Sequence, residues 1–332
     1  MTILRIVAKV VFGLLLTIGL VWAAAALWID GPRPTALAGA LAAGLLVAAI
    51  AALALVRPVL RGALVAAGLF GLVFAWWSWL PASNDRDWQP DVAQLSAATF
   101  DGDLVTIRNV RNFQYRSETD FTEHWEERTY DLSKLRGVDL FLSYWGPTEI
   151  AHTVASWEFE DGPPLAISIE TRKEKGESYS ALLGFFRQYE VYYVVADERD
   201  LIGLRTNHRG EQVFLYRLRG PGDFPKKLLL SYLTEVNRLA AEPRWYNALT
   251  HNCTTTIRLH VMQAGIQNPL DWRLLLNGHL DELLYERGNI DRTLPFAEMR
   301  AASDVTARAK AAGDGEGFSA AIREGLPPRP AP

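Results

Sequence analysis

The hydrophobic pattern divides the chain into an apolar beginning and a longer part in which apolar and polar positions alternate. Three apolar runs occupy residues 7–28, 36–56 and 63–80. Each is close to the ~20 residues that a helix needs to cross the hydrocarbon core of a bilayer. Two runs follow the first after short loops, which a signal peptide alone does not explain. The pattern therefore predicts a membrane anchor of three transmembrane helices in residues 1–82.

Charges in the short loops predict the orientation of this anchor. Arg5 and Lys9 precede the first run, and Arg57 and Arg61 lie between the second and the third. Because positively charged loops remain in the cytoplasm, the N-terminus and the second loop are expected there. Three crossings then place the rest of the chain on the periplasmic, extracytoplasmic side of the inner (cytoplasmic) membrane.

Residues 83–300 carry the patterns of strands and amphipathic helices, and we expect them to form one α+β domain. Strands are expected at 103–116, 138–145, 149–159, 165–172, 190–196 and 213–218, and helices at 223–240, 254–264 and 271–286. Two other segments are expected outside the packed core. The charges Asp197, Glu198, Arg199, Asp200 and Arg205 are most simply a solvated connection. Residues 301–332, rich in Ala, Gly and Pro, are expected to form a flexible tail.

A predicted hairpin carries a histidine beside polar residues. Its strands, 149–159 and 165–172, flank a turn that contains Gly and Pro. Apolar and polar residues alternate on the second strand, so Ser168 and Glu170 share a face. A polar face beside His152 on the partner strand fits an orienting hydrogen bond. A half-solvated sheet explains the same alternation.

The only cysteine of the 332 residues stands at the start of a predicted helix. Cys253 precedes the run 254–264, which Gly265 is placed to end, and Asn252 or Thr250 is a suitable N-cap. The partial positive charge at a helix start favours a thiolate. A free cysteine is often a buried small hydrophobe, but polar neighbours make a poor core segment. A lone cysteine outside the cytoplasm forms no internal disulfide, and we interpret it as a nucleophile.

Charge and motifs narrow the chemistry further. The formal net charge of −4 gives no reason to expect a nucleic-acid partner. The string His-Trp-Glu-Glu at 124–127 lacks the second histidine of a zinc-protease helix. With no metal-ligand cluster in the sequence, neither a metal nor another cofactor is expected.

Two features resemble known families. His152 on a strand, followed much later by the pair Asn252 and Cys253 at a helix start, is similar to the circularly permuted branch of the NlpC/P60 papain-like superfamily, which includes lecithin:retinol acyltransferase-like enzymes. A more specific resemblance, covering roughly residues 90–265, is to the outer domain of the Lnb-type lipoprotein N-acyltransferase family. It is carried by residues 108–113, 125–130, 150–153, 168–172, 197–200 and 246–255.

The resemblance implies a circularly permuted papain-like (NlpC/P60-type) α+β domain behind the three transmembrane helices. It also implies transfer of an acyl chain from a membrane lipid to the N-terminal amine of a lipoprotein. Cys253 would attack the lipid ester and form a thioester, and His152 would take the thiol proton and later serve the incoming amine. Backbone N–H groups at the start of the cysteine helix are candidate oxyanion donors.

The remaining site residues follow from the same resemblance. In the papain-like pattern the third catalytic residue comes from the strand after the histidine strand, which indicates Glu170 or Ser168. We favour Glu170, because a carboxylate both orients an imidazole and stabilises its charged form. His251 ranks second as the base. Candidate substrate-binding residues are Asn252, Ser168, Arg172 and Arg205; the two arginines suit a phosphate or carboxylate, and structural ion pairs explain them equally well.

Two other classes of function stay open at this stage. A cell-envelope cysteine amidase or peptidase of the NlpC/P60 type would use the same dyad with water in place of the amine. It predicts a polar, open cleft beside Cys253. A non-catalytic envelope protein predicts a thiol of ordinary reactivity.

Overall fold

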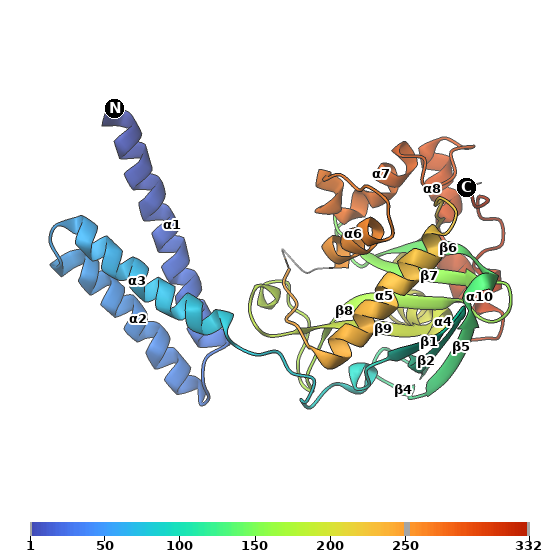
Figure 1. The fold of residues 1–332 in the computed structure, drawn as a ribbon, viewed down its shortest axis with the longest axis horizontal. Helices are drawn as coiled ribbons and strands as arrows, with labels where there is room; N and C mark the ends of the chain where they lie inside the picture. The colour runs from blue at the N-terminus through green and yellow to red at the C-terminus, as the bar shows by residue number, and fades with distance from the viewer. Residues whose placement is uncertain (1, 249–252, 331–332) are drawn as a thin grey trace. The chain divides into compact units, whose positions relative to one another are not determined.

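A computed structural model describes residues 2–248 and 253–330 (Figure 1). At Cys253 only the main chain is described. The chain divides into two compact units. The helical unit comprises Met1–Ser83, Tyr179–Glu190 and Trp245–Asn247, and the sheet unit comprises Asn84–Ser178, Val191–Arg244 and Ala248–Pro332.

The three apolar runs form helices, as predicted. They are α1 (Thr2–Ile29), α2 (Thr35–Leu55) and α3 (Val59–Ser78), and each is long and apolar enough to cross a membrane. Small side chains lie where the helices touch: Ala23, Ala26 and Ala66 are fully buried. A Cβ at Gly62 would stand 2.4 Å from the carbonyl oxygen of Ala52. Small residues at these contacts allow the backbones to approach closely, as in other membrane helix bundles.

A short segment from later in the chain belongs to the helical unit because it binds the acidic residue that follows α1. Asp30 accepts hydrogen bonds from Trp77 Nε1 at 2.7 Å and from the Gln188 side-chain amide at 2.7 Å. Its carboxylate also accepts the main-chain N–H of Arg187 at 3.2 Å, and the Arg187 guanidinium lies 4.1 Å from the ring centre of Trp77. The hydropathy pattern contains no sign of this attachment.

The sheet unit is a mixed α/β domain built around an eight-stranded sheet. The strands are β1 (Ala97–Asp101), β2 (Leu104–Arg111), β5 (Trp125–Asp131), β6 (Leu135–Tyr144), β7 (His152–Phe159), β8 (Leu165–Arg172), β9 (Glu190–Asp197) and β10 (Gln212–Arg217). Their order is β1-β2-β9-β8-β7-β6-β10, and β5 pairs with β2. β3 (Gln114–Tyr115) and β4 (Phe121–Thr122) form a separate pair. The predicted hairpin is confirmed as β7 and β8.

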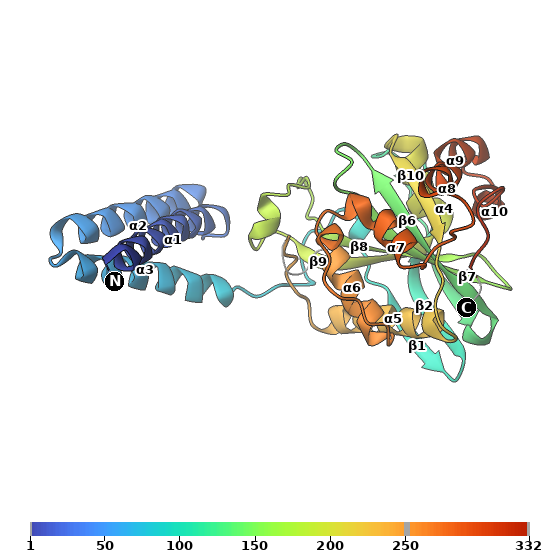
Figure 2. The same ribbon diagram turned by 90° about the horizontal axis from the view of Figure 1, so that it is seen from above.

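Helices cover both faces of this sheet (Figure 2). They are α4 (Glu198–Gly203), α5 (Phe224–Ala241), α6 (Cys253–Gln263), α7 (Leu280–Glu286), α8 (Phe296–Ser303), α9 (Thr306–Ala312) and α10 (Phe318–Ala321). Helices α5 and α6 lie on one face, and α4, α9 and α10 lie on the other. β9, deep in the sheet, is apolar in sequence because both of its faces are covered.

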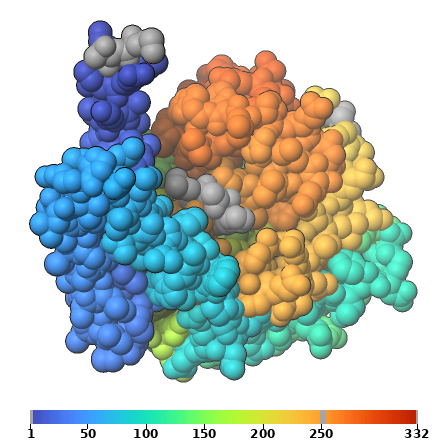
Figure 3. All heavy atoms as spheres, turned by 60° about the vertical axis from the view of Figure 1, so that its left-hand side comes forward, coloured from blue at the N-terminus to red at the C-terminus, as the bar shows by residue number. Residues whose placement is uncertain are grey.

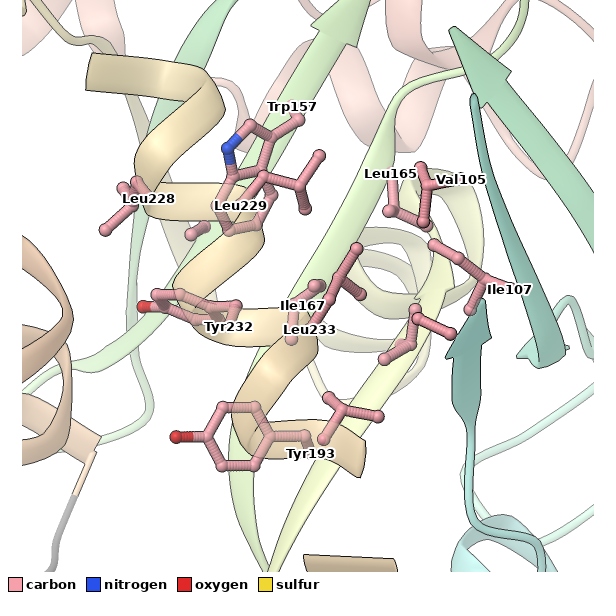
Figure 4. Close-up of a cluster of buried hydrophobic side chains, with 14 of the residues drawn as sticks. Val105, Ile107, Trp157, Leu165, Ile167, Tyr193, Leu228, Leu229, Tyr232 and Leu233 are labelled. Atoms are coloured by element: carbon pink, nitrogen blue, oxygen red, sulfur yellow. The ribbon is translucent and has the colours of Figure 1, made fainter. Parts of the chain in front are cut away.

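The face under α5 and α6 is an apolar core (Figure 4). Leu229 and Leu233 of α5 are fully buried against the sheet. The Trp157 ring of β7 meets the Tyr232 ring edge to face at 5.1 Å and donates its N–H to Pro225 O at 2.9 Å. The amphipathic helix predicted at 223–240 is therefore confirmed as α5. On α6, the partly buried Ile257 and Val261 pack against the same core, and Gly265 follows the helix with φ +92°, as the predicted C-cap requires.

The predicted solvated connection after β9 is wrong. Residues Glu198–Gly203 form α4, and Asp200 at its centre is fully buried. Asp200 receives the Arg111 guanidinium, with Nη2 at 2.6 Å and Nε at 3.0 Å, and the main-chain N–H of Phe113 at 2.6 Å. The charge pattern misled because each buried acid is matched by a partner that lies far away in the sequence.

The predicted flexible tail is also wrong, since α9 and α10 pack onto the sheet. Four apolar residues of this segment are at most 2% exposed: Val305, Ala309, Phe318 and Ile322. Arg323 then binds two carboxylates that are fully buried, Asp139 at 2.8 Å and Glu198 at 2.6 Å. Widely spaced apolar residues among Ala and Gly kept the average hydrophobicity low and hid a helical pattern.

Candidate active site

Three neighbouring strands place polar side chains in one row across the sheet. Ser143 of β6 pairs with His152 of β7. The register of β7 with β8 pairs Val154 with Ser168, which brings Glu170 opposite His152 two residues along. Facing residues on adjacent strands point to the same side of a sheet. Val154 belongs to the apolar cluster on the α4 face, so the row lies on that face.

His152 is held by hydrogen bonds at one of its two ring nitrogens. Nε2 lies 2.6 Å from Ser168 Oγ and 3.1 Å from Glu170 Oε1. Ser168 Oγ donates to Glu170 Oε1 at 2.7 Å, so its proton is already engaged and Nε2 is the donor. A neutral ring then carries its lone pair on Nδ1, which makes no hydrogen bond to the described residues. The arrangement orients the imidazole and leaves Nδ1 as the proton acceptor.

Glu170 is kept ionised by its surroundings. Arg205 Nη2 lies 2.7 Å from Glu170 Oε1, and Arg205 Nη1 lies 3.3 Å from Glu211 Oε2. Burial alone would raise the pKa of Glu170, but the charges of His152 and Arg205 and the hydrogen bonds from His152 and Ser168 lower that pKa well below its usual 4.5. A carboxylate that stays charged is suited to orient the imidazole and to stabilise its protonated form.

The first turn of α6 is tied to the start of β7 by one buried amide. Asn277 accepts the N–H of Ala151 at 3.0 Å and donates to Ala151 O at 2.6 Å. The same side-chain nitrogen donates to Thr254 Oγ1 at 2.8 Å and lies 3.5 Å from Thr153 Oγ1. The residue after Cys253 is thereby linked to the residues on either side of His152, about a hundred positions earlier in the chain.

Cys253 begins α6, as predicted, so its main chain occupies a helix N-terminus. The predicted N-caps, Asn252 and Thr250, and the second-ranked base, His251, lie outside the described residues. Strand alternation gives one further constraint. Thr153 points toward Asn277 and α6, whereas His152 points to the α4 face. The start of β7 is therefore linked to α6 through Thr153 on one face, whereas His152 belongs to the polar row on the other face.

Two predicted substrate-binding arginines have different surroundings. Arg205 belongs to the His152 network and is 5% exposed. Arg172 does not join it. Its guanidinium donates to Val92 O at 3.0 Å and Ala93 O at 2.8 Å and lies 4.2 Å from the ring centre of Trp88. Arg172 therefore lies apart from the His152 network, and its contacts with main-chain carbonyls and a buried ring fit the structural role left open above.

Sequence reasoning missed three members of this site. Ser143 is fully buried and donates to Glu211, and the strand pattern alone could have placed Ser143 beside His152 once the pairing of β6 with β7 was known. Glu211 and Asn277 lie outside the regular strands and α-helices, where no periodic pattern indicates a contact. Among the described residues, no group of three His, Cys, Asp or Glu could hold a metal ion.

Comparison with known families identifies the part of the chain that contains this site. Residues 121–278 match the family described as the Lnb N-terminal periplasmic domain. The match includes His152, Glu170 and Cys253, begins later than the stretch in which the resemblance was noted, and extends past Asn277. Comparisons with curated proteins and with solved structures gave no match. With the three apolar helices, the family match indicates a membrane protein with a periplasmic domain. The match covers 158 of the 332 residues, and it supports an Lnb-type assignment for this part of the chain.

Proposed function

We propose that the protein is a membrane-anchored thiol acyltransferase. It moves an acyl chain from a membrane lipid to the N-terminal amine of a lipoprotein, at the periplasmic surface of the inner membrane. The observation that carries the proposal is the family match, which spans both His152 and Cys253. The three apolar helices support it, because donor and acceptor are both lipids that reside in a bilayer.

In the first step, Cys253 gives its proton to Nδ1 of His152 and attacks the ester carbonyl of the lipid. Cys253 is the only cysteine, and the helix N-terminus favours its thiolate. The new bond is the C–S bond of a thioester, and the bond that breaks is the ester C–O bond. The lipid alkoxide leaves with the proton from His152. Main-chain N–H groups in the first turn of α6 are suited to stabilise the oxyanion.

In the second step, the lipoprotein amine attacks the thioester while His152 takes a proton from it. The C–S bond breaks, an amide forms and the Cys253 thiolate is restored. Ser168, Glu170 and Arg205 hold the Nε2 side of the ring throughout. A circularly permuted papain-like arrangement accounts for a cysteine at a helix start and a histidine on a sheet strand, and we adopt it as the fold that this function would use.

One observation favours acyl transfer over the amidase or peptidase alternative. The cavity beside the first turn of α6 is lined mostly by apolar residues, including Leu259, Leu270 and Leu275. A hydrolase of peptides was expected to have a polar cleft there. An apolar wall beside the first turn of the helix suits an acyl chain.

Mass spectrometry of a lipoprotein N-terminal peptide tests the function. The host lacks its own N-acyltransferase and carries the intact protein, Cys253→Ala or His152→Gln, with membrane abundance measured for each. We expect an added acyl chain with the intact protein, none with Cys253→Ala, and a rate lower by about 10²–10⁴ with His152→Gln. Lys310→Gln, an exposed change on α9, is the matched control. An unmodified peptide with the intact protein present in the membrane would contradict the proposal.

A further inference from the structure

An apolar groove lies along α6, the helix that begins at Cys253. Its volume is about 450 Å³. The lining consists of one face of α6 and the segment that follows α6 before α7: Thr255, Arg258, Leu259, Leu270, Asp271, Trp272, Leu274 and Leu275. Thr255 is only two residues from Cys253, so one end of the groove reaches the first turn of the helix.

The groove is bordered by large apolar side chains that face solvent. Leu270 is 83% exposed, Leu275 is 70% exposed and Trp272 is 55% exposed. Leu259 and Met262 on α6 are also exposed. This part of the sheet unit, orange in Figure 3, forms a continuous piece of its surface. Burial of such side chains away from water is favourable, so a contiguous set left in water marks a surface that binds something apolar.

The rim of the groove is positively charged. Arg258 donates to Asn268 O at 2.8 Å, and Arg287 donates to Asn268 Oδ1 at 2.6 Å. Neither guanidinium has a carboxylate within ion-pair distance among the described residues. The one acid in the lining, Asp271, is bound by Arg273 at 3.0 Å, and the hydrogen bonds from Arg273 lower the pKa of Asp271 to about 2. The rim therefore places two guanidinium groups beside an apolar trough, and the charges of Asp271 and Glu286 act on Arg287 only from beyond ion-pair distance.

We propose that this groove binds one acyl chain of an anionic phospholipid, with the phosphate held by Arg258 and Arg287. An apolar trough with cations at its edge is complementary to an acyl chain that ends in a phosphate head group. The three apolar helices of the same chain keep the protein at a bilayer, where this ligand is abundant. The inference rests on the proposed function only for the reason why the protein would bind this lipid, namely to present the acyl ester to Cys253. Binding itself needs no catalysis.

Photocrosslinking of the full-length protein in nanodiscs tests the groove directly. The probe is phosphatidylglycerol with a diazirine in one acyl chain, and a diacylglycerol with the same chain but no phosphate is the second probe. Labelled peptides are mapped by mass spectrometry. We expect label from both probes within residues 255–276. Leu270→Asn with Leu275→Asn is expected to lower that label about tenfold at sub-saturating probe, because two apolar contacts are lost.

Matched variants separate binding from folding and from chemistry. Leu104→Asn changes a leucine on β2 that is 47% exposed, and it is expected to leave the label unchanged. Arg258→Gln with Arg287→Gln is expected to reduce labelling by the phosphatidylglycerol probe but not by the diacylglycerol probe. Arg258→Lys with Arg287→Lys is expected to restore much of the labelling by the phosphatidylglycerol probe, because lysine keeps the positive charge. It lacks the planar guanidinium that donates to Asn268.

Each outcome decides the proposal. Label confined to residues 1–83, or label within 255–276 that survives the double leucine change, overturns it. Competition by an apolar peptide without competition by unlabelled phosphatidylglycerol would assign the groove to a protein partner and also overturn it. Labelling of Cys253→Ala at the level of the intact protein is expected. If acyl transfer is absent but labelling of residues 255–276 persists, the proposed function is wrong and lipid binding in the groove stands. If acyl transfer survives the double leucine change, the groove proposal is wrong and the proposed function stands.

Discussion

The two faces of the sheet are stabilised in different ways. The face under α5 and α6 is filled by apolar side chains such as Trp157 and Leu229. The face under α4, α9 and α10 also contains charged groups that are almost fully buried, among them Asp139 and Asp200. On the first face, close packing of apolar groups excludes water. On the second, each charge needs its partner in place, and the row that includes His152 belongs to this face.

The difference suggests why the site lies where it does. A histidine and a carboxylate need hydrogen-bond partners in fixed positions, and the α4 face supplies them from strands that are already rigid. The cysteine helix packs on the opposite, apolar face through Ile257 and Val261. The Asn277 side chain links the first turn of α6 to the start of β7.

Removal of a buried charge on the α4 face should be the most damaging change. Asp200→Asn leaves the Arg111 guanidinium, which is 3% exposed, without its counter-charge. We expect a loss of about 3–5 kcal/mol in the free energy of unfolding. Urea unfolding of the detergent-solubilised protein, followed by tryptophan fluorescence, measures it. Asp120→Asn in the exposed pair with Arg116 should leave the curve unchanged. A loss below about 1 kcal/mol for Asp200→Asn would show that this face tolerates unpaired charge.

Truncation in the apolar face should cost somewhat less. Leu229→Ala removes a side chain that is fully buried between α5 and the sheet, and we expect about 2–5 kcal/mol from lost burial and the cavity that remains. Leu104→Ala, at an exposed leucine of β2, is the control and should have little effect. The same unfolding measurement serves both variants. If the two substitutions had equal effects, the apolar face would not be the tightly packed core described above.

Acid should weaken the apolar face through one buried histidine. His260 of α6 lies 2.7 Å from Tyr193 Oη and 2.7 Å from Ser231 Oγ, and burial lowers its pKa from 6.5 to about 4. The unfolded chain binds this proton more readily, so the stabilisation is complete above pH 6.5 and is lost as the pH falls from 6.5 to about 4. The loss is at most about 3 kcal/mol. His260→Gln should remove this part of the pH dependence, whereas His124→Gln, at an exposed histidine, should not.

Acid should also lower the unfolding free energy through the α4 face, at lower pH and by a smaller amount. The pKa of Glu170 is lowered well below 4.5, so its contribution is present above 4.5 and is lost as the pH falls through its folded-state pKa. Its side chain is 27% exposed, which reduces the effect. Glu170→Gln should flatten the fall in unfolding free energy below pH 4.5 and leave the 6.5 to 4 window unchanged. A change confined to the higher window would contradict the assignment of the two groups.

The sequence alone predicted those strands and helices whose positions depend on local periodicity. Alternation on residues 165–172 predicted the two faces of β8, and the amphipathic pattern at 223–240 predicted α5, whose apolar side packs on the sheet. Charged segments were misjudged for a physical reason: Glu198 and Asp200 resemble surface residues until Arg323 and Arg111 are brought to them by the fold. β5, with its polar sequence, was missed because it pairs with only one strand of the sheet path.

The candidate site shows the same division. His152, Ser168 and Glu170 are near one another within a hairpin, so their register was predictable from sequence. Arg205 was predicted as a residue, but its partner Glu211 and the amide of Asn277 come from segments without regular periodicity. Arg172 shares a strand face with Ser168 and Glu170, yet its guanidinium packs against the Trp88 ring and donates to main-chain carbonyls. Such contacts are decided by tertiary packing, which local patterns do not encode.

Whether Cys253 carries the acyl chain can be read from intact-mass spectrometry of the purified protein. The protein is incubated with phospholipid of a single acyl-chain length and without an amine acceptor. We expect one added acyl chain that hydroxylamine removes, that is absent from Cys253→Ala and that forms more slowly in His152→Gln. Because Cys253 is the only cysteine, a thioester can form nowhere else. An acyl adduct that persists in Cys253→Ala, or no adduct on the intact protein while an amine acceptor is still acylated, would contradict the account.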